Sequence, residues 1–341
     1  MEFNFENLNT SSIGLSKAIL ENGVSRKTRG YDCVEFPEPV LIHIHNPCDR
    51  YINIKERKNH KVLPFAESLA LATGVNNMEL YAGYVPSMMG YSDDGEYQRA
   101  GYGPRMRAFT GFGGGYKVDN PFTRHIYSGE TKVVDQLKFV IDTLNKDINS
   151  RQAIITIHDP AKDCFNKNGQ LLETKDQPCS RSLQFMMVNG KLDATLYIRS
   201  NDMIFGYMAV NMFNFTFIQE YVANILGVEI GVYHHFANNL HYYDDKTELV
   251  KTMAGLNPDD YKSEFGVWQY PNQFNSLSTF DDNVNDVFSF ERGLRLKKGA
   301  VDLYNPNDFP DFFGDWLRVF KQYWTKEQQE YINPYLTKLF S

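Results

Sequence analysis

A hairpin of two strands joined by Asn189-Gly190 is the feature that most constrains how this chain can fold. Residues 183–188 form an apolar run, and residues 192–198 alternate apolar with polar side chains. Asn-Gly is favoured in a type I′ turn, because both central residues need a positive φ. The pattern therefore predicts an antiparallel hairpin whose open end brings Cys179 close to Arg199.

The residues at that open end indicate covalent chemistry. Cys179 follows Pro178, and the returning strand runs into Arg199-Ser200-Asn201-Asp202. The thiolate is the nucleophilic form of cysteine, and a neighbouring guanidinium favours that form. A lone cysteine is more often a buried structural thiol. The arrangement with Arg199 nevertheless suits covalent catalysis on an anionic substrate.

Composition limits the class of protein. With 341 residues, 42% of them hydrophobic, the chain can bury one large core, and we expect a single elaborated domain over 1–341. A net charge of -7 argues against direct nucleic-acid binding but allows a free nucleotide. No apolar run is long enough for a membrane span, so a cytoplasmic protein with no membrane partner is expected. The four cysteines lack a Cys-x-x-Cys pair, which favours reduced thiols.

Hydrophobic periodicity and stop signals predict a mixture of helices and strands. Helices are expected from a cap at Ser11 or Ser12 to Gly23, over 64–72, from a cap at Thr131 to Leu144, and over 210–226, 311–323 and 326–339. Strands are expected over 153–158 and 229–236. The polar segment 159–178 is interpreted as an exposed insertion that carries no chemistry, and 250–341 as an extended C-terminal region.

The motifs around Cys179 resemble those of the thymidylate synthase superfamily. The matching residues are Pro178-Cys179, Gln184-Phe185, Arg199-Ser200, Asp202, Gly206 and His241-Tyr242-Tyr243, preceded by Glu67, Tyr102-Gly103 and Asn149-Ser150-Arg151. The resemblance covers about residues 20–250. It implies an α+β fold in which helices flank a twisted mixed sheet, and a homodimer formed by the backs of two sheets.

The resemblance also implies roles for individual residues. Cys179 would add to carbon 6 of a pyrimidine nucleoside monophosphate, Glu67 would relay protons, Tyr102 would help to remove the carbon 5 proton, and Asp202 would complete the catalytic set. The co-substrate would be the reduced folate 5,10-methylenetetrahydrofolate, with no metal, near His60, Asp202 and Gly206. The implied nucleotide ligands are Arg29, Arg151 from the partner subunit, Gln184, Arg199, Ser200, Asn201, Asn211, His241 and Tyr243.

Simpler interpretations compete with some of these roles. Glu67 could be a glutamate on a helix surface, and His60 could be an isolated surface histidine. A metal site built from His234, His235 and His241 has poor geometry, because adjacent strand residues point to opposite faces. Residues 111–115 are rich in glycine, but no Gly-Lys-Ser/Thr follows, so a mobile turn is favoured over a phosphate loop.

Four departures from thymidylate synthase bear on the reaction. Ser180 replaces the histidine after the nucleophile, and Val210 falls where an asparagine reads the uracil edge. Met88 and Tyr91 fall near the tryptophans of the folate wall, and the usual C-terminal lid is not recognisable.

These departures and the Arg-Ser-Asn-Asp-x-x-Phe-Gly form resemble the phage deoxycytidylate and deoxyuridylate hydroxymethylases. Asn211 and Asn214 could replace the missing base reader, although Asn211 is expected on a different helix face. The choice of cytosine or uracil stays open. The alternatives are a thymidylate synthase that methylates dUMP and a catalytically silent nucleotide-binding homologue, against which the set of Cys179, Glu67, Tyr102 and Asp202 argues.

Overall fold

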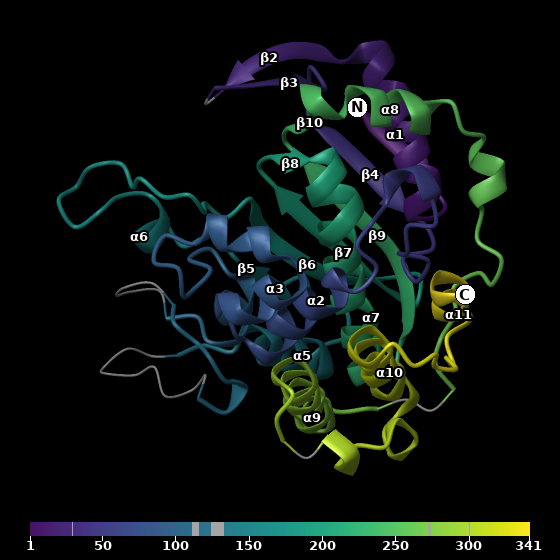
Figure 1. Cartoon of the computed structure of the whole chain (residues 1–341). Helices are drawn as coiled ribbons and strands as arrows, with labels where there is room; N and C mark the ends of the chain where they lie inside the picture. The colour runs from purple at the N-terminus through teal and green to yellow at the C-terminus, as the bar shows by residue number, and fades with distance from the viewer. Residues whose placement is uncertain (29, 111–115, 124–132, 272–273, 300) are drawn as a thin grey trace.

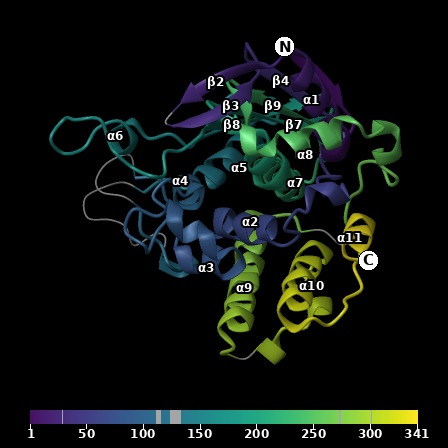
Figure 2. The ribbon, with the colours of Figure 1, turned by 45° about the horizontal axis from the view of Figure 1, so that its top comes forward.

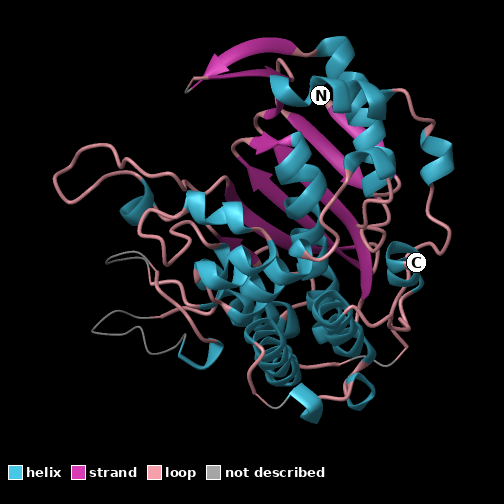
Figure 3. Ribbon diagram, in the orientation of Figure 1, coloured by secondary structure: helices cyan, strands magenta, loops and turns pink. Residues whose placement is uncertain are grey.

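A mixed six-stranded sheet forms the centre of the molecule, with the order β1-β4-β9-β7-β6-β5 (Figure 3). The structure is a computed structural model that describes residues 1–28, 30–110, 116–123, 133–271, 274–299 and 301–341. The strands are β1 (Glu2–Phe5), β4 (Val40–Ile44), β5 (Ile154–Thr156), β6 (Ser180–Val188), β7 (Lys191–Ile198) and β9 (Glu229–Ala237). The pairs β1 with β4 and β7 with β9 are parallel, and the others are antiparallel.

A smaller sheet lies beside the first at its upper edge in Figure 1. Its order is β2-β3-β10-β8. The strands are β2 (Val24–Thr28), β3 (Tyr31–Glu35), β8 (Asn201–Asp202) and β10 (Leu240–Tyr243). Because β8 follows directly from β7, this sheet continues the open end of the hairpin and lies next to Cys179.

Helices cover one side of the six-stranded sheet (Figure 2). The α-helices of the described residues are α1 (Leu8–Asn22), α2 (Leu63–Thr73), α3 (Met78–Tyr84), α4 (Tyr102–Arg107), α5 (Gln136–Lys146), α6 (Pro160–Asp163), α7 (Met212–Leu226), α8 (Thr247–Ala254), α9 (Leu277–Leu296), α10 (Asp311–Thr325) and α11 (Pro334–Phe340). Of these, α6 lies in a segment that projects away from the sheet (Figure 1). A π-helical segment, η4 (Met203–Asn211), leads into α7. None of the helices in the described ranges combines the length and the apolar character needed to cross a membrane. The predicted α+β fold is confirmed.

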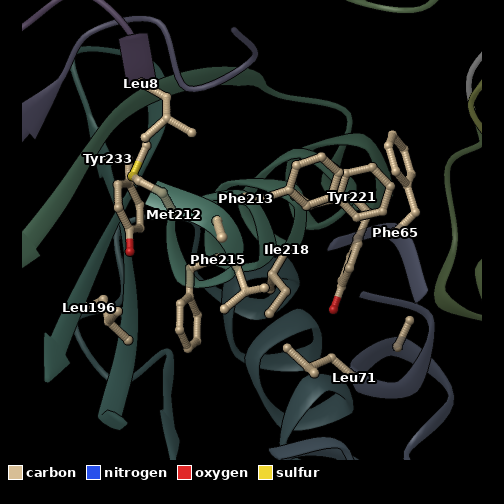
Figure 4. Packing of buried hydrophobic residues seen from close by; sticks show 14 of the residues in the cluster. Leu8, Phe65, Leu71, Leu196, Met212, Phe213, Phe215, Ile218, Tyr221 and Tyr233 are labelled. Atoms are coloured by element: carbon tan, nitrogen blue, oxygen red, sulfur yellow. The ribbon is translucent and has the colours of Figure 1, made fainter. Parts of the chain in front are cut away.

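The helix α7 is the centre of the core. It lies between the sheet and the outer helices, and its side chains are buried on all sides, which explains why its sequence is apolar all round. Figure 4 shows Phe213 and Phe65 in contact, with ring centroids 4.7 Å apart. Phe217 stacks on Phe312 of α10 at 4.8 Å. The C-terminal helices therefore pack directly on the core that supports the sheet.

Several predicted elements are confirmed. The hairpin forms as predicted, with φ of 51° at Asn189 and 80° at Gly190. The helix α2 covers the predicted 64–72, and Gly74 ends it in the left-handed conformation. Gly227 ends α7 in the same way, since glycine has no Cβ to oppose a positive φ.

Other predicted boundaries are wrong. Asn7, and neither Ser11 nor Ser12, caps α1: its side chain accepts the Thr10 N–H at 2.8 Å in a capping box. The helix expected over 326–339 is confined to α11, because Lys326 is left-handed and ends α10.

The helix expected from Thr131 begins later, at Gln136, where Asp135 accepts the Lys138 N–H at 3.1 Å. Thr131 itself lies outside the described residues, as do Arg29 and the glycine-rich 111–115. The strand expected over 153–158 is shorter, and the 20 residues of α9 were not predicted.

On the face of the six-stranded sheet that points away from the helices, several side chains are partly or fully exposed. One row across it joins His43, His234, Thr195, Gln184 and Ile154, in the register of β4, β9, β7, β6 and β5. In the next row the rings of Tyr197 and Phe236 lie 5.5 Å apart, and Tyr197 is 39% exposed. We call this surface the open sheet face.

Candidate active site

A cavity of about 340 Å³ lies where β6, η4 and α2 meet, and we call it the central cavity. It brings together ten of the predicted site residues. They are Glu67, Tyr102, Cys179, Arg199, Ser200, Asn201, Asp202, Gly206, Asn211 and Tyr243. Residues far apart in the sequence thus meet around one thiol.

Arg199 holds the turn that presents Cys179. Its backbone N–H donates to the Cys179 carbonyl at 2.9 Å. Its Nε donates to the Pro178 carbonyl at 3.1 Å, and its Nη2 to the Gln177 carbonyl at 3.2 Å. Arg199 also lines the cavity, so one guanidinium both fixes the nucleophile's turn and presents positive charge to a ligand.

Tyr102 contacts the nucleophile's neighbour. The Ser180 N–H donates to the Tyr102 hydroxyl oxygen at 3.1 Å, and burial raises the pKa of Tyr102 to about 12. The phenol therefore stays protonated at neutral pH and can still donate its own hydrogen. The Ser180 side chain is buried and interacts with the same phenol.

Glu67 is a carboxyl group that can exchange a proton near neutral pH. Burial raises its pKa to about 7, against the opposing effect of a hydrogen bond from Asn214. Asn214 Nδ2 donates to Glu67 Oε2 at 3.0 Å, and Ser68 Oγ donates to Asn214 Oδ1 at 2.9 Å. These contacts fix the orientation of the amide and, through it, the carboxyl group.

The π-helical segment η4 brings Asn211 to the cavity. The Met212 N–H donates to the Tyr207 carbonyl, five residues earlier, so the hydrogen bond spans one residue more than in an α-helix. Asn211 therefore lines the cavity together with Val210, and its Nδ2 donates to Asn201 Oδ1 at 2.8 Å. The expectation that Asn211 lies on a different helix face is wrong, because it assumed α-helical spacing.

Gly206 leaves room for this pair of amides. A Cβ atom at Gly206 would lie 3.2 Å from both Asn201 Nδ2 and Oδ1, and 3.3 Å from Asn211 Nδ2. Asp202 begins η4 and accepts the N–H groups of Ile204 and Phe205 at 2.9 and 3.2 Å. Burial raises the pKa of Asp202.

A second cavity of about 700 Å³ adjoins the first and shares Gln177, Arg199, Ser200 and Tyr243 with it. We call it the arginine cavity, because Arg26 and Arg181 also line it, together with the predicted His241. Such guanidinium groups suit a phosphate.

Asn239 connects the predicted residues of the arginine cavity and was missed in the sequence. Its Oδ1 accepts a hydrogen bond from Ser200 Oγ at 3.3 Å and lies 2.7 Å from His241 Nδ1. Its Nδ2 donates a hydrogen bond to the Glu35 carboxylate at 2.7 Å. Glu35 also pairs with Arg26. No local pattern marks an asparagine in a strand connection for such a role.

Three predicted residues lie away from both cavities. His60 Nδ1 accepts the Leu63 N–H at 2.9 Å, and its ring lies 5.6 Å from that of Tyr323. Gln184 donates to the Arg151 carbonyl at 3.0 Å at the open sheet face, where Arg151 is exposed. The ligand roles of His60, Gln184, Arg151 and Arg29 stay predictions.

The histidines of the alternative metal site point apart. His234 lies on the open sheet face, with its Nδ1 2.6 Å from His43 Nδ1. His235 is fully buried on the other face, with its ring 5.0 Å from that of Tyr207. Within the described ranges, no group of three or more His, Cys, Asp or Glu side chains could hold a metal ion.

The segment 159–178 contributes to the site, contrary to expectation. Asp163 is buried, and its Oδ2 accepts Arg105 Nη1 at 2.7 Å. Thr174, Lys175, Asp176 and Gln177 line the central cavity, as do Tyr81 and Gln98. Residues 167–171 are exposed, as the polar composition predicted, but Asp159, Lys162 and Asp163 are buried and form ion pairs.

Comparison with known proteins agrees with this geometry. Residues 89–282 match the thymidylate synthase family. The chain is 34% identical over 224 residues to the deoxyuridylate hydroxymethyltransferase of Bacillus phage SP01, covering 64% of this chain and 54% of that protein. The enzyme of the same name from Pseudomonas phage M6 is 31% identical over 235 residues, with 69% and 59% covered.

A third deoxyuridylate hydroxymethyltransferase, from Delftia phage PhiW-14, is 29% identical over 236 residues, with 67% of this chain and 59% of that protein covered. The chain thus spans somewhat more than half the length of these relatives. The family match extends over more than half of the chain and includes Cys179, Arg199 and Asp202. The chain belongs to the thymidylate synthase family.

Proposed function

We propose that the protein is a pyrimidine nucleotide carbon-5 hydroxymethyltransferase that uses 5,10-methylenetetrahydrofolate and acts on dUMP or dCMP. The observation that carries the proposal is the meeting of Cys179, Glu67 and Tyr102 in one cavity whose outer wall contains Met88 and Tyr91. The names of the phage relatives make dUMP the first substrate to test.

The reaction begins with the nucleotide. Arg199 and Ser200 bind its phosphate, and the Cys179 thiolate forms a bond to carbon 6, which makes carbon 5 nucleophilic. Carbon 5 then takes the one-carbon unit from the folate. Glu67 donates a proton to the leaving folate nitrogen, and Tyr102 assists in removing the carbon 5 proton. An exocyclic methylene group remains on the pyrimidine.

The central cavity fits the planar ring of a folate. Leu71, Met88, Tyr91 and Phe205 supply apolar contact surface, and polar groups such as Asp202 lie at its edge. The co-substrate supplies the one-carbon unit. His60 lies outside this wall, so its contact with the folate requires a direct binding test.

The wall also bears on the product. Water attack on the methylene group gives a hydroxymethyl group and leaves tetrahydrofolate, whereas hydride transfer gives a methyl group and dihydrofolate. Met88 is buried but Tyr91 is 53% exposed, so this part of the wall is open to water. A wetter wall favours hydroxymethylation.

The open sheet face supports a homodimer in which two sheets pack back to back. It presents Tyr197, Phe236 and Ile154, and apolar surface of this kind is normally covered by a partner. Arg151 lies at its border, where it could reach the arginine cavity of the other subunit. The cytoplasmic location and the lack of a nucleic-acid partner stay predictions.

The test is to incubate the protein with methylenetetrahydrofolate and, separately, dUMP, dCMP, UMP and CMP, and to determine the mass of each nucleotide product and the oxidation state of the folate. We expect a hydroxymethyl-sized mass gain with tetrahydrofolate. A methyl-sized gain with dihydrofolate would instead establish a thymidylate synthase. Nucleotide binding without turnover of any substrate would indicate the catalytically silent homologue.

A further inference from the structure

A second carboxyl group faces the central cavity and has no role in the steps described so far. Asp176 lies three residues before Cys179 and lines the cavity with Tyr81 and Tyr102. It interacts electrostatically with both tyrosines, and Tyr81 also interacts with Glu67. Besides Asp202, the cavity lining therefore contains two carboxyl groups, Glu67 and Asp176, that interact with Tyr81.

The backbone around Asp176 is held firmly. The Asp176 N–H donates to Thr174 Oγ1 at 3.0 Å, and Arg99 Nη1 donates to the Asp176 carbonyl at 3.2 Å. The carboxyl oxygen Oδ2 accepts the Ala100 N–H at 2.8 Å. Among the residues that the structure describes, no hydrogen bond reaches the other oxygen, Oδ1, which leaves it available to a molecule in the cavity.

The electrostatic environment suits a proton acceptor. Burial raises the pKa of Asp176, while the Ala100 N–H and the nearby Arg105 and Arg99 oppose that rise. The carboxylate form is thus retained but made more basic than an exposed aspartate. Glu67 differs, because its Oε2 accepts Asn214 and its proton is required at the leaving folate.

We propose that Asp176 is the general base for the water that attacks the exocyclic methylene group. This assignment rests on the proposed hydroxymethyl transfer. The water oxygen forms a bond to the methylene carbon, and its proton passes to Asp176 Oδ1. The electron pair of the methylene double bond moves to the carbon 4 oxygen as an enolate. When the enolate collapses, the bond between carbon 6 and the Cys179 sulfur breaks, and thiolate and hydroxymethyl nucleotide are released.

The test separates formation of the methylene group from its hydration. Release of tritium from carbon 5 of a labelled nucleotide reports the first stage, and hydroxymethyl nucleotide reports the second. Asp176→Asn keeps an acceptor for the Ala100 N–H but removes the base. In a single turnover, with protein in excess over nucleotide, we expect tritium release at the normal rate while hydroxymethyl product forms about 100-fold or more slowly, the range expected for general base catalysis.

A thiol provides an independent measurement. The thiolate of 2-mercaptoethanol attacks the methylene carbon without a base, so Asp176→Asn should accumulate a nucleotide thioether. Asp93→Asn is the matched control: Asp93 accepts the Lys175 N–H at 2.9 Å and thus holds the same segment, but it lies outside the cavity lining. This control should keep tritium release and hydroxymethyl product equal.

The outcomes distinguish the two proposals. If Asp176→Asn lowers tritium release and hydroxymethyl product equally, or lowers neither, the assignment of Asp176 is wrong while the proposed function stands. If the unaltered protein releases no tritium, or gives a methyl product, the proposed function is wrong and the assignment fails with it. Continued tritium release by the variant also shows that its site is folded.

Discussion

At the scale of single residues, the site depends on a half-buried carboxyl group and a guanidinium that each have a structural role and a place in the cavity. Glu67 is half-buried in α2, and its partial removal from water raises its pKa to about 7. Arg199 binds the carbonyls of Gln177 and Pro178 and still faces the cavity. A substitution of either residue should therefore change both the stability of the folded chain and the properties of the cavity.

Replacement of Glu67 should change how stability depends on pH. Between about pH 4.5 and 7 the folded chain keeps a proton that the unfolded chain has lost, so stability falls as pH rises through this window. Glu67→Gln removes this cost, which reaches at most about 3 kcal/mol above pH 7. The variant should be inactive, match the wild type at pH 4.5 in thermal unfolding, and exceed its stability at pH 8. Glu173→Gln, an exposed control, should leave the pH dependence unchanged, and a parallel change in both variants would contradict the role of burial.

Replacement of Arg199 should affect the phosphate more than the rest of the nucleotide. A charge-assisted hydrogen bond contributes about 1.5 to 3 kcal/mol, so Arg199→Ala should weaken dUMP binding by roughly 10- to 150-fold. Deoxyuridine, which lacks the phosphate, should lose much less affinity in calorimetric titrations. Arg199→Lys retains the charge and should give an intermediate loss. Equal losses for nucleotide and nucleoside would refute the phosphate contact.

At the scale of elements, the segment η4 decides which side chains of residues 210 and 211 line the central cavity. Its i→i+5 hydrogen bonding shifts the facing residue from Val210 to both Val210 and Asn211. An amide can donate and accept hydrogen bonds, whereas a valine side chain can do neither. The π-helix thus supplies a polar group at a place where the sequence alone suggested a loss.

Loss of the Asn211 amide should weaken recognition of the base. One hydrogen bond contributes about 0.5 to 1.5 kcal/mol, so Asn211→Ala should raise the dUMP dissociation constant roughly 2- to 13-fold. Binding of deoxyribose 5-phosphate, which has no base, is the control and should not change. Gly206→Ala should act in the same direction, because its Cβ would crowd Asn201 and Asn211. If deoxyribose 5-phosphate loses as much affinity as dUMP does, Asn211 does not contact the base.

The sequence predicts the elements that local residue signals determine. It does not predict features of the structure that depend on contacts between distant segments. The hairpin, α2 and the end of α7 follow from Asn189-Gly190, Gly74 and Gly227. The π-helix has no residue signature, since it depends on which carbonyl each N–H reaches. The family resemblance assigned motif residues from Glu67 to Tyr243 to the site. It gave no reason to include Asp176, whose place in the cavity lining follows only from the structure.

At the scale of the whole molecule, the open sheet face is the largest consequence of the topology. All helices that cover the core lie on the other side of the six-stranded sheet or around its edge, so a row from His43 to Ile154 remains available to a partner. In the proposed homodimer, a second copy packs on this face and lends its Arg151 to the arginine cavity.

A mixing experiment tests that arrangement. Arg151→Ala and Cys179→Ala chains should each be inactive, but a mixed dimer contains one site with both an intact thiol and an intact arginine. After subunit exchange, activity should recover toward one quarter of the wild-type level, because roughly half of the dimers are mixed and each has one complete site. Wild-type chains mixed with Cys179→Ala chains control for exchange. Failure to recover activity despite exchange would exclude a shared site.

The spread of the cavity lining along the chain also affects how the protein is made. Its wall begins at Glu67 and is complete only with Tyr243. At roughly 5 to 20 residues per second, a ribosome needs on the order of ten seconds or more to pass between them. During that interval the growing chain carries the Glu67 carboxyl group and later the Cys179 thiol, with no complete cavity around either. A chain whose synthesis stops between Cys179 and Tyr243 thus exposes a thiol that the finished cavity encloses.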